Sequence, residues 1–173
     1  INEFDLGRVQ KAGAIFDIAK LDSINNLYVK NIVPAELGKL LRPYLDSHNP
    51  TEEQLTKTAH LFKDRLNKLS EIKELAGFIF SPPQYDLNLL IWKNTSRGEI
   101  KSNLETVLMV LEKSPDDLFS IDSIATEIMP LASKFGRGET LWPLRVALSG
   151  MEKSPGPFEI MEVLGKKEST SRI

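Results

Sequence analysis

The sequence has 173 residues, with 22 basic and 24 acidic side chains and no cysteine. This length suits one large domain or two small ones, and the lack of cysteine excludes a disulfide scaffold, a thiolate metal site and a cysteine nucleophile. Taken alone, the formal net charge of −2 argues against nucleic-acid binding, and the longest apolar run, 107–111, is far shorter than the ~20 residues of a membrane span.

The start of the chain carries no periodic pattern. It begins with Ile1 rather than Met, which indicates a piece of a longer protein, and no secretory signal opens it. The stretch Gly7–Phe16 has no regular spacing of apolar residues, so we expect a short irregular leading segment.

The first helical pattern begins at Pro34, a residue suited to the first turn of a helix. Apolar residues then recur at helical spacing through Leu45. Thr51 and Gln54 form a capping-box pattern that starts a second helix, whose apolar stripe runs to Leu69. A shorter helix is expected from Ser70 through Phe78, ended by the break at 81–83, where two prolines follow a serine.

The rest of the chain also reads as helix. Gly136 and Gly165 stand where helix C-caps are expected. No segment alternates apolar and polar residues over more than a few positions, so the predicted fold class is all-α. The further expected helices are 86–93, 99–113, 121–134, 140–149 and 157–164.

Charge is distributed unevenly along the chain. Residues 57–73 hold five basic and two acidic side chains, and residues 134–173 hold seven basic and five acidic ones. Between them, residues 114–133 hold four acids and no base. Two basic patches around an acidic block fit a phosphate-facing surface, but charge alone favours ordinary solvated helix faces, because runs this mild are common.

Residues with catalytic chemistry are scarce. His48 lies in a turn and His60 on an amphipathic helix, and neither has a Ser or Cys nucleophile motif beside it. Gly136-Arg137-Gly138 lacks the strand and the Lys-Ser/Thr ending of a phosphate loop, and the Asp116-Asp117 carboxylate pair fits a turn or helix start. We therefore predict no catalytic residue, no metal site and no cofactor in this chain.

The C-terminal part carries the most distinctive motifs. They are the run 141–150 (LWPLRVALSG), then 154–160 (SPGPFEI), then 164–166 (LGK). Further motifs precede these in the chain and stand in the order expected for the same family: 16–22 (FDIAKLD) with 25–28 (NNLY), 61–69 (LFKDRLNKL), and YD and WK at 85 and 92. Together they resemble the C-terminal anticodon-binding region of the bacterial-type glutamyl-tRNA synthetases, a family of class I aminoacyl-tRNA synthetases, over nearly the whole chain.

The resemblance implies a fold of two packed helical subdomains, an anticodon-binding helical cage, after the irregular segment. It divides the chain into residues 1–48, with the leading segment and first helices, and two anticodon-binding subdomains at 49–115 and 116–173. The family's HIGH-like and KMSKS-like motifs are absent from this sequence. The resemblance therefore implies a cytoplasmic, monomeric parent ligase whose catalytic part, which uses ATP and glutamate, lies outside this chain.

The resemblance also implies which residues bind the anticodon of glutamate-specific tRNA, the expected partner, with neither DNA nor a membrane involved. Arg65 matches the reader of the third anticodon base, and Arg145 matches an arginine near the first. The loop Ser154–Phe158 matches the segment around the first two bases. Its expected contact residues are Ser154, Pro155, Pro157 and Phe158.

Some expectations remain open at this point. A further anticodon-contacting arginine of some family members has no counterpart, because residues 114–133 contain no Arg. Arg65 also fits an ordinary helix-surface residue paired with Glu71, and Trp92 and Trp142 are expected in the core. The alternative function is a helical protein–protein interaction module without tRNA binding. A parent ligase that accepts both glutamate and glutamine tRNAs is a variant of the anticodon-binding function.

Overall fold

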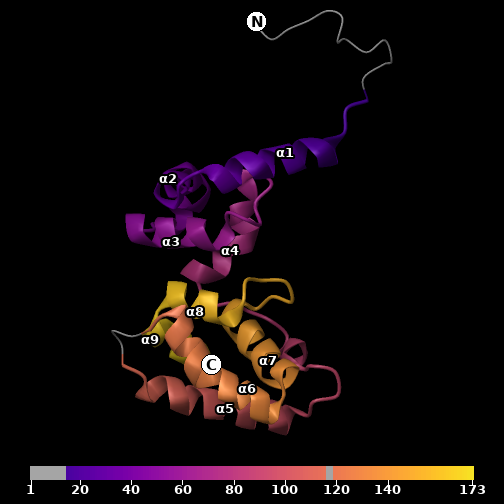
Figure 1. The fold of residues 1–173 in the computed structure, drawn as a ribbon, viewed down its shortest axis with the longest axis vertical. Helices are drawn as coiled ribbons and strands as arrows, with labels where there is room; N and C mark the ends of the chain where they lie inside the picture. The colour runs from indigo at the N-terminus through magenta and orange to yellow at the C-terminus, as the bar shows by residue number, and fades with distance from the viewer. Residues whose placement is uncertain (1–14, 116–118) are drawn as a thin grey trace, which may run out of the picture.

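The structure is a computed structural model that describes residues 15–115 and 119–173. Over those ranges it is all-α, as predicted, with nine α-helices, three short 3₁₀ helices and no strand (Figure 1). Most of the predicted irregular segment 7–16 and the Asp116-Asp117 pair lie outside the described residues. The α-helices are α1 (Ile18–Asn31), α2 (Pro34–Leu45), α3 (Glu52–Phe62), α4 (Ile72–Phe80), α5 (Arg97–Lys113), α6 (Ile121–Phe135), α7 (Arg137–Ser149), α8 (Pro157–Leu164) and α9 (Lys166–Arg172); the 3₁₀ helices are η2 (Asp46–His48), η3 (Leu69–Glu71) and η4 (Leu87–Leu90).

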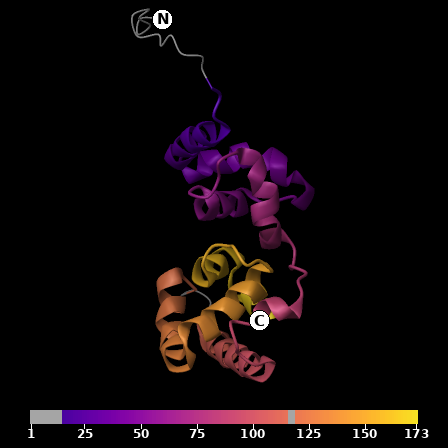
Figure 2. The ribbon, with the colours of Figure 1, turned by 90° about the vertical axis from the view of Figure 1, so that its right-hand side faces the viewer.

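The helices form two groups along the long axis of the molecule. Figures 1 and 2 show α1–α4 at one end and α5–α9 at the other, joined by the segment 81–96 that contains η4. The groups meet where α8 packs on α3 and α4 from the first group and on α6 and α7 from the second. The division 1–48, 49–115 and 116–173 stays a prediction about domain organisation, and its boundaries fall between helices that pack together, α2 with α3 and α5 with α6.

The core of the first group depends on close packing of α2 against α3. Gly38 makes this approach possible, because a Cβ at this position would lie 3.0 Å from the carbonyl carbon of Leu55. The capping box predicted at Thr51 and Gln54 is present and starts α3. The interior of this group is filled by fully buried apolar side chains: Leu37, Leu41, Leu45, Leu55, Ala59, Phe62, Leu66 and Ile72.

The apolar stripe predicted to run to Leu69 as one helix is interrupted. α3 ends at Phe62, where the carbonyl oxygen accepts the N–H of Arg65 at 2.8 Å, a tight bond that closes the last turn. The Glu71 carboxylate then accepts the N–H of Asn67 at 2.8 Å. A side chain that captures backbone donors competes with helix, so Arg65 lies in a turn rather than on a helix surface.

The segment predicted as a helix at 86–93 is also shorter than expected. Only η4 forms, because the Asp86 carboxylate accepts the N–H of Asn88 at 2.9 Å and closes a local turn. Lys93 has φ 51°, a left-handed backbone conformation that no α-helix contains. Two helices, α1 and α9, were not predicted. Most apolar side chains of α1 are exposed, and α9 carries none, so neither has the buried stripe that periodicity detects.

The C-terminal segment closes the open ends of other helices. Glu162 of α8 accepts the N–H of Ile121, the first residue of α6, at 3.1 Å. Lys166, at the start of α9, donates to the carbonyl oxygens of Glu112 and Ser114 at the end of α5, at 3.1 and 2.6 Å. Cations at a helix C-terminus and anions at an N-terminus also interact favourably with the helix dipole.

Arg172 joins the two groups directly. Its Nη1 donates to the carbonyl oxygen of Phe78 in α4 at 2.7 Å and to that of Leu148 in α7 at 2.9 Å, and its side chain is only 4% exposed. The Phe78 carbonyl lacks a donor from its own helix, because residue 82 is a proline without an N–H. One guanidinium therefore satisfies a carbonyl in the last turn of a helix from each group.

Arg172→Ala should lower the free energy of unfolding by about 3 kcal/mol, because it leaves two partly buried carbonyls without a donor. Urea unfolding followed by circular dichroism measures the loss. The matched control is Arg97→Ala, whose exposed guanidinium donates to the Asn88 side chain at 2.8 Å; a change within about 0.5 kcal/mol is expected there. Equal losses in the two variants would contradict the joining role of Arg172.

Candidate nucleic-acid interface

The predicted site residues gather around the turn between α7 and α8. Arg65 and Pro155 line a cleft of about 250 Å³. Arg145 and Pro157 line a second cleft of about 360 Å³. The short turn that carries both prolines therefore contributes to each cleft. Arg65 and Arg145, which are 80 positions apart in the sequence, thus lie at adjacent places on the surface.

Arg145 is presented by α7, which begins three residues earlier than the predicted helix 140–149. Its guanidinium carbon lies 4.8 Å from the centre of the Trp142 ring, within the range of a cation–π contact. Its Nε is buried and has no hydrogen-bond partner among the described residues. Burial and, to a smaller extent, the like charge of Arg65 lower the pKa of Arg145.

The two tryptophans are not core residues, contrary to expectation. Both are half-buried and line the Arg145 cleft, with ring centres 5.0 Å apart. Trp142 is oriented by its Nε1, which donates to the carbonyl oxygen of Leu89 at 2.8 Å. Trp92 packs against the backbone of Gly138, where any Cβ would lie 2.0 Å from the Trp92 ring nitrogen. The only hint in the sequence was their position beside the motifs, because apolar periodicity does not separate a core tryptophan from a cleft one.

Arg65 is exposed in the turn after α3. Among the described residues no hydrogen bond or ion pair engages its guanidinium. The pairing with Glu71 considered from the sequence does not form, because that carboxylate accepts the N–H groups of Asn67 and Lys68. Arg65 is therefore available to a ligand.

Acidic side chains share the Arg65 cleft without neutralising the arginine. Asp64, Glu159 and Glu162 line it together with His60. Glu162 is engaged at the start of α6. Carboxylates around an unpaired guanidinium narrow the range of ligands, because they repel any phosphate group that does not approach the guanidinium directly.

The turn 154–158 is built by its own contacts. The Ser154 side chain is buried and lies 3.2 Å from the Ser149 hydroxyl, which donates to it. The Ser154 hydroxyl donates to the carbonyl oxygen of Pro155 at 3.1 Å. Pro157 starts α8, as predicted, and Phe158 is half-buried against the core. The hydroxyl of Ser154 thus holds the turn, and its contact with a base stays a prediction.

The arrangement favours a ligand rich in hydrogen-bond acceptors. Two guanidinium groups lie near enough for the charge of one to lower the pKa of the other, and neither is paired within the described part of the chain. A guanidinium presents parallel donors that match acceptor pairs on phosphates and on base edges. Over residues 15–115 and 119–173 there is no group of three potential metal-ligating side chains, and no described helix is long and apolar enough to cross a membrane.

An all-helical scaffold that presents two unpaired guanidinium groups, one of them over a tryptophan ring, defines a domain suited to contact with single-stranded RNA. The family model described as the anticodon binding domain matches residues 36–173. The chain therefore belongs to the anticodon-binding domain family.

Known relatives are longer proteins. The chain is 36% identical over 190 residues to a glutamate–tRNA ligase of Herpetosiphon aurantiacus, covering 100% of this chain and 37% of the relative. It is 37% identical over 181 residues to one of Clostridium tetani, covering 36% of that protein. A crystal structure of a glutamate tRNA ligase from Elizabethkingia meningosepticum superposes with a TM-score of 0.83 at 26% identity, covering 98% of this chain and 34% of that one. The chain thus spans a little over a third of the relatives that it matches.

Gly138→Ala should displace Trp92 and lower the free energy of unfolding by about 1–3 kcal/mol, because a methyl group overlaps the ring. Tryptophan emission should shift toward longer wavelength as the ring becomes more exposed. Urea unfolding and fluorescence spectra check both effects. Gly98→Ala is the matched control, since nothing lies within 4 Å of its Cβ; unchanged or slightly raised stability is expected there. Wild-type spectra for Gly138→Ala would overturn the packing role.

Proposed function

We propose that this chain is the anticodon-binding part of a glutamate–tRNA ligase and binds the anticodon of glutamate-specific tRNA. The observation that carries the proposal is the pair of unpaired guanidinium groups, Arg65 and Arg145, on the two sides of the turn 154–158. Membership of the anticodon-binding domain family and the names of the relatives support the partner.

The chemistry of an anticodon fits this surface. Anticodon bases lie in a single-stranded loop, from which a protein can splay them out so that their Watson–Crick edges accept hydrogen bonds and their faces stack on side chains. Cytosine offers two adjacent acceptors, which match the parallel donors of a guanidinium. The Trp142 ring already lies 4.8 Å from the Arg145 guanidinium carbon, so the ring restricts where this guanidinium can lie.

The separate roles follow the resemblance. Arg65 reads the third anticodon base and contributes to rejection of glutamine tRNA, and Arg145 contacts the first base. The turn with Ser154, Pro155, Pro157 and Phe158 surrounds the first two bases. The two-cleft geometry supports a separate reader on each side of the turn.

The remaining part of the parent supplies catalysis. In this proposal a catalytic part outside the present sequence uses ATP and glutamate to charge the tRNA, and this chain contributes recognition without a cofactor. The parent acts as a monomer in the cytoplasm.

Arg65→Ala should weaken discrimination at the third anticodon base by about 1–3 kcal/mol, the range for a bidentate contact to a base. Filter binding of the chain to glutamate tRNA and to tRNAs altered at one anticodon position measures this. Arg97→Ala, an arginine outside both clefts, is the charge-matched control and should keep the wild-type profile. Equal weakening toward every anticodon variant would show that Arg65 is only an electrostatic contact.

Arg145→Ala should change discrimination at a different position, the first base, by a similar amount. The same panel of tRNAs reports it. Two identical specificity profiles would overturn the assignment of separate readers.

Binding by the wild-type chain should weaken steeply between about 0.05 and 0.2 M salt, because cationic contacts to RNA release counterions. A salt series of the same filter-binding assay measures the slope. No measurable tRNA binding at low salt would refute the proposed function and favour a protein–protein interaction module.

A further inference from the structure

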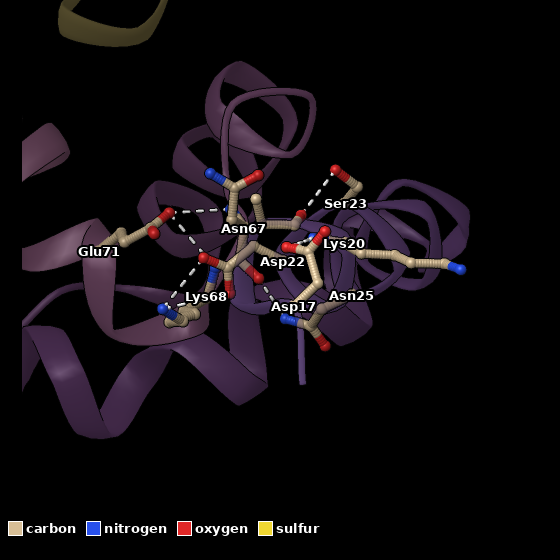
Figure 3. Close-up of polar contacts among 9 residues, drawn as sticks. Asp17, Lys20, Asp22, Ser23, Asn25, Asn67, Lys68 and Glu71 are labelled. Atoms are coloured by element: carbon tan, nitrogen blue, oxygen red, sulfur yellow. Dashed lines mark hydrogen bonds and ion pairs between the residues drawn. The ribbon is translucent and has the colours of Figure 1, made fainter. Parts of the chain in front are cut away.

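Helix α1 is attached to the first group by polar contacts more than by apolar burial. Val29 is its single buried side chain among those described. Figure 3 shows the α1 side chains Asp22 and Asn25 reaching the loop that contains Asn67 and Lys68. The Lys68 ammonium lies 3.1 Å from the Asp22 carboxylate, and the Asn25 amide donates to the carbonyl oxygen of Asn67.

A second amide of α1 reaches one residue closer to Arg65. The side chain of Asn26 donates to the carbonyl oxygen of Leu66 at 2.7 Å, and this contact is partly shielded from water. The Glu71 carboxylate accepts the N–H of Asn67 from the opposite side. The backbone after Arg65 is therefore held on its carbonyl side by α1 and on its N–H side by η3.

The position of Arg65 depends on these backbone hydrogen bonds. Its own N–H is bonded to the carbonyl oxygen of Phe62, and the next side chain, Leu66, is fully buried. The guanidinium itself has no partner in the described part of the chain, so nothing but the backbone and the ligand orients it. A reader of a base edge needs its donors placed within a fraction of an ångström.

We propose that Asn26, assisted by Asn25 and Asp22, is a positioning residue that presents Arg65 to the anticodon without touching the RNA. The inference rests on the proposed function. It extends recognition to α1, which precedes the residues 36–173 that the family model matches. α1 sets the path of the turn after α3, and the turn sets the direction of the guanidinium.

The test is a double-mutant cycle on the 173-residue chain with the panel of anticodon variants. Asn26→Ala should lower discrimination at the third base roughly three- to tenfold, the effect of one lost hydrogen bond. It should leave first-base discrimination unchanged. In the Arg65→Ala background, adding Asn26→Ala should produce no further loss at the third base, because the residue acts through Arg65.

Controls separate this role from general destabilisation. Asn31→Ala removes an amide from the same helix whose bond, to the Leu27 carbonyl, stays within α1; its binding profile should match the wild type. If Asn26→Ala does not fold, Asp22→Asn removes only the exposed ion pair with Lys68 and should give a smaller loss at the same base.

The outcomes distinguish the two proposals. If Arg65→Ala leaves third-base discrimination intact, the reading role of Arg65 itself is wrong. If Arg65→Ala acts but folded Asn26→Ala and Asp22→Asn keep the wild-type profile, only the positioning role of α1 is overturned. Equal, additive losses at every base would also overturn it, since they would report stability alone.

Discussion

The arrangement of the molecule depends on backbone groups at helix ends, which must find partners wherever water is excluded. Glu162 of α8 and Lys166 and Arg172 of α9 satisfy such groups at the ends of α6, α5, α4 and α7. The bond from Arg172 to the Phe78 carbonyl joins the two helical groups, and the others hold α5, α6 and α7 to α8 and α9 within the second group. The turn between α7 and α8 connects two of the helices held in this way, and it contributes to both candidate clefts.

A rigid frame allows the surface to keep two like charges close together. Nearby guanidinium groups repel, and burial adds a desolvation cost for Arg145, as the lowered pKa of its side chain indicates. In most surfaces a carboxylate would relieve this. Here Glu162 is engaged with a backbone N–H, and Asp64 and Glu159 line the Arg65 cleft without forming an ion pair with the arginine. The repulsion between the two arginines and the burial of Arg145 therefore lower stability at this surface. Binding of an acceptor-rich ligand would recover it.

Much of the fold could be predicted because amphipathic helices with capping signals are encoded locally. The helix at 157–164 and the Thr51 cap follow the predicted residues. The turn at Arg65 could not be predicted, because apolar spacing continues through Leu66 while Glu71 captures the backbone. Helix α9 could not be predicted either, since it carries no apolar stripe and its Arg172 bonds to the Phe78 carbonyl 94 residues away. For the candidate site, the motifs pointed to both arginines and the turn, while the tryptophans lining one cleft emerged only from packing.

The bond between Arg172 and the Phe78 carbonyl has an evolutionary consequence. Pro82 ends α4 early and withholds a donor, and a side chain from the far end of the chain replaces it. The two positions therefore form one structural unit despite their separation of 90 residues. Among relatives that share this fold, sequences that replace the arginine should tend also to replace the proline or to lengthen the helix before it. Such paired changes would trace how the two halves stay joined while their sequences diverge.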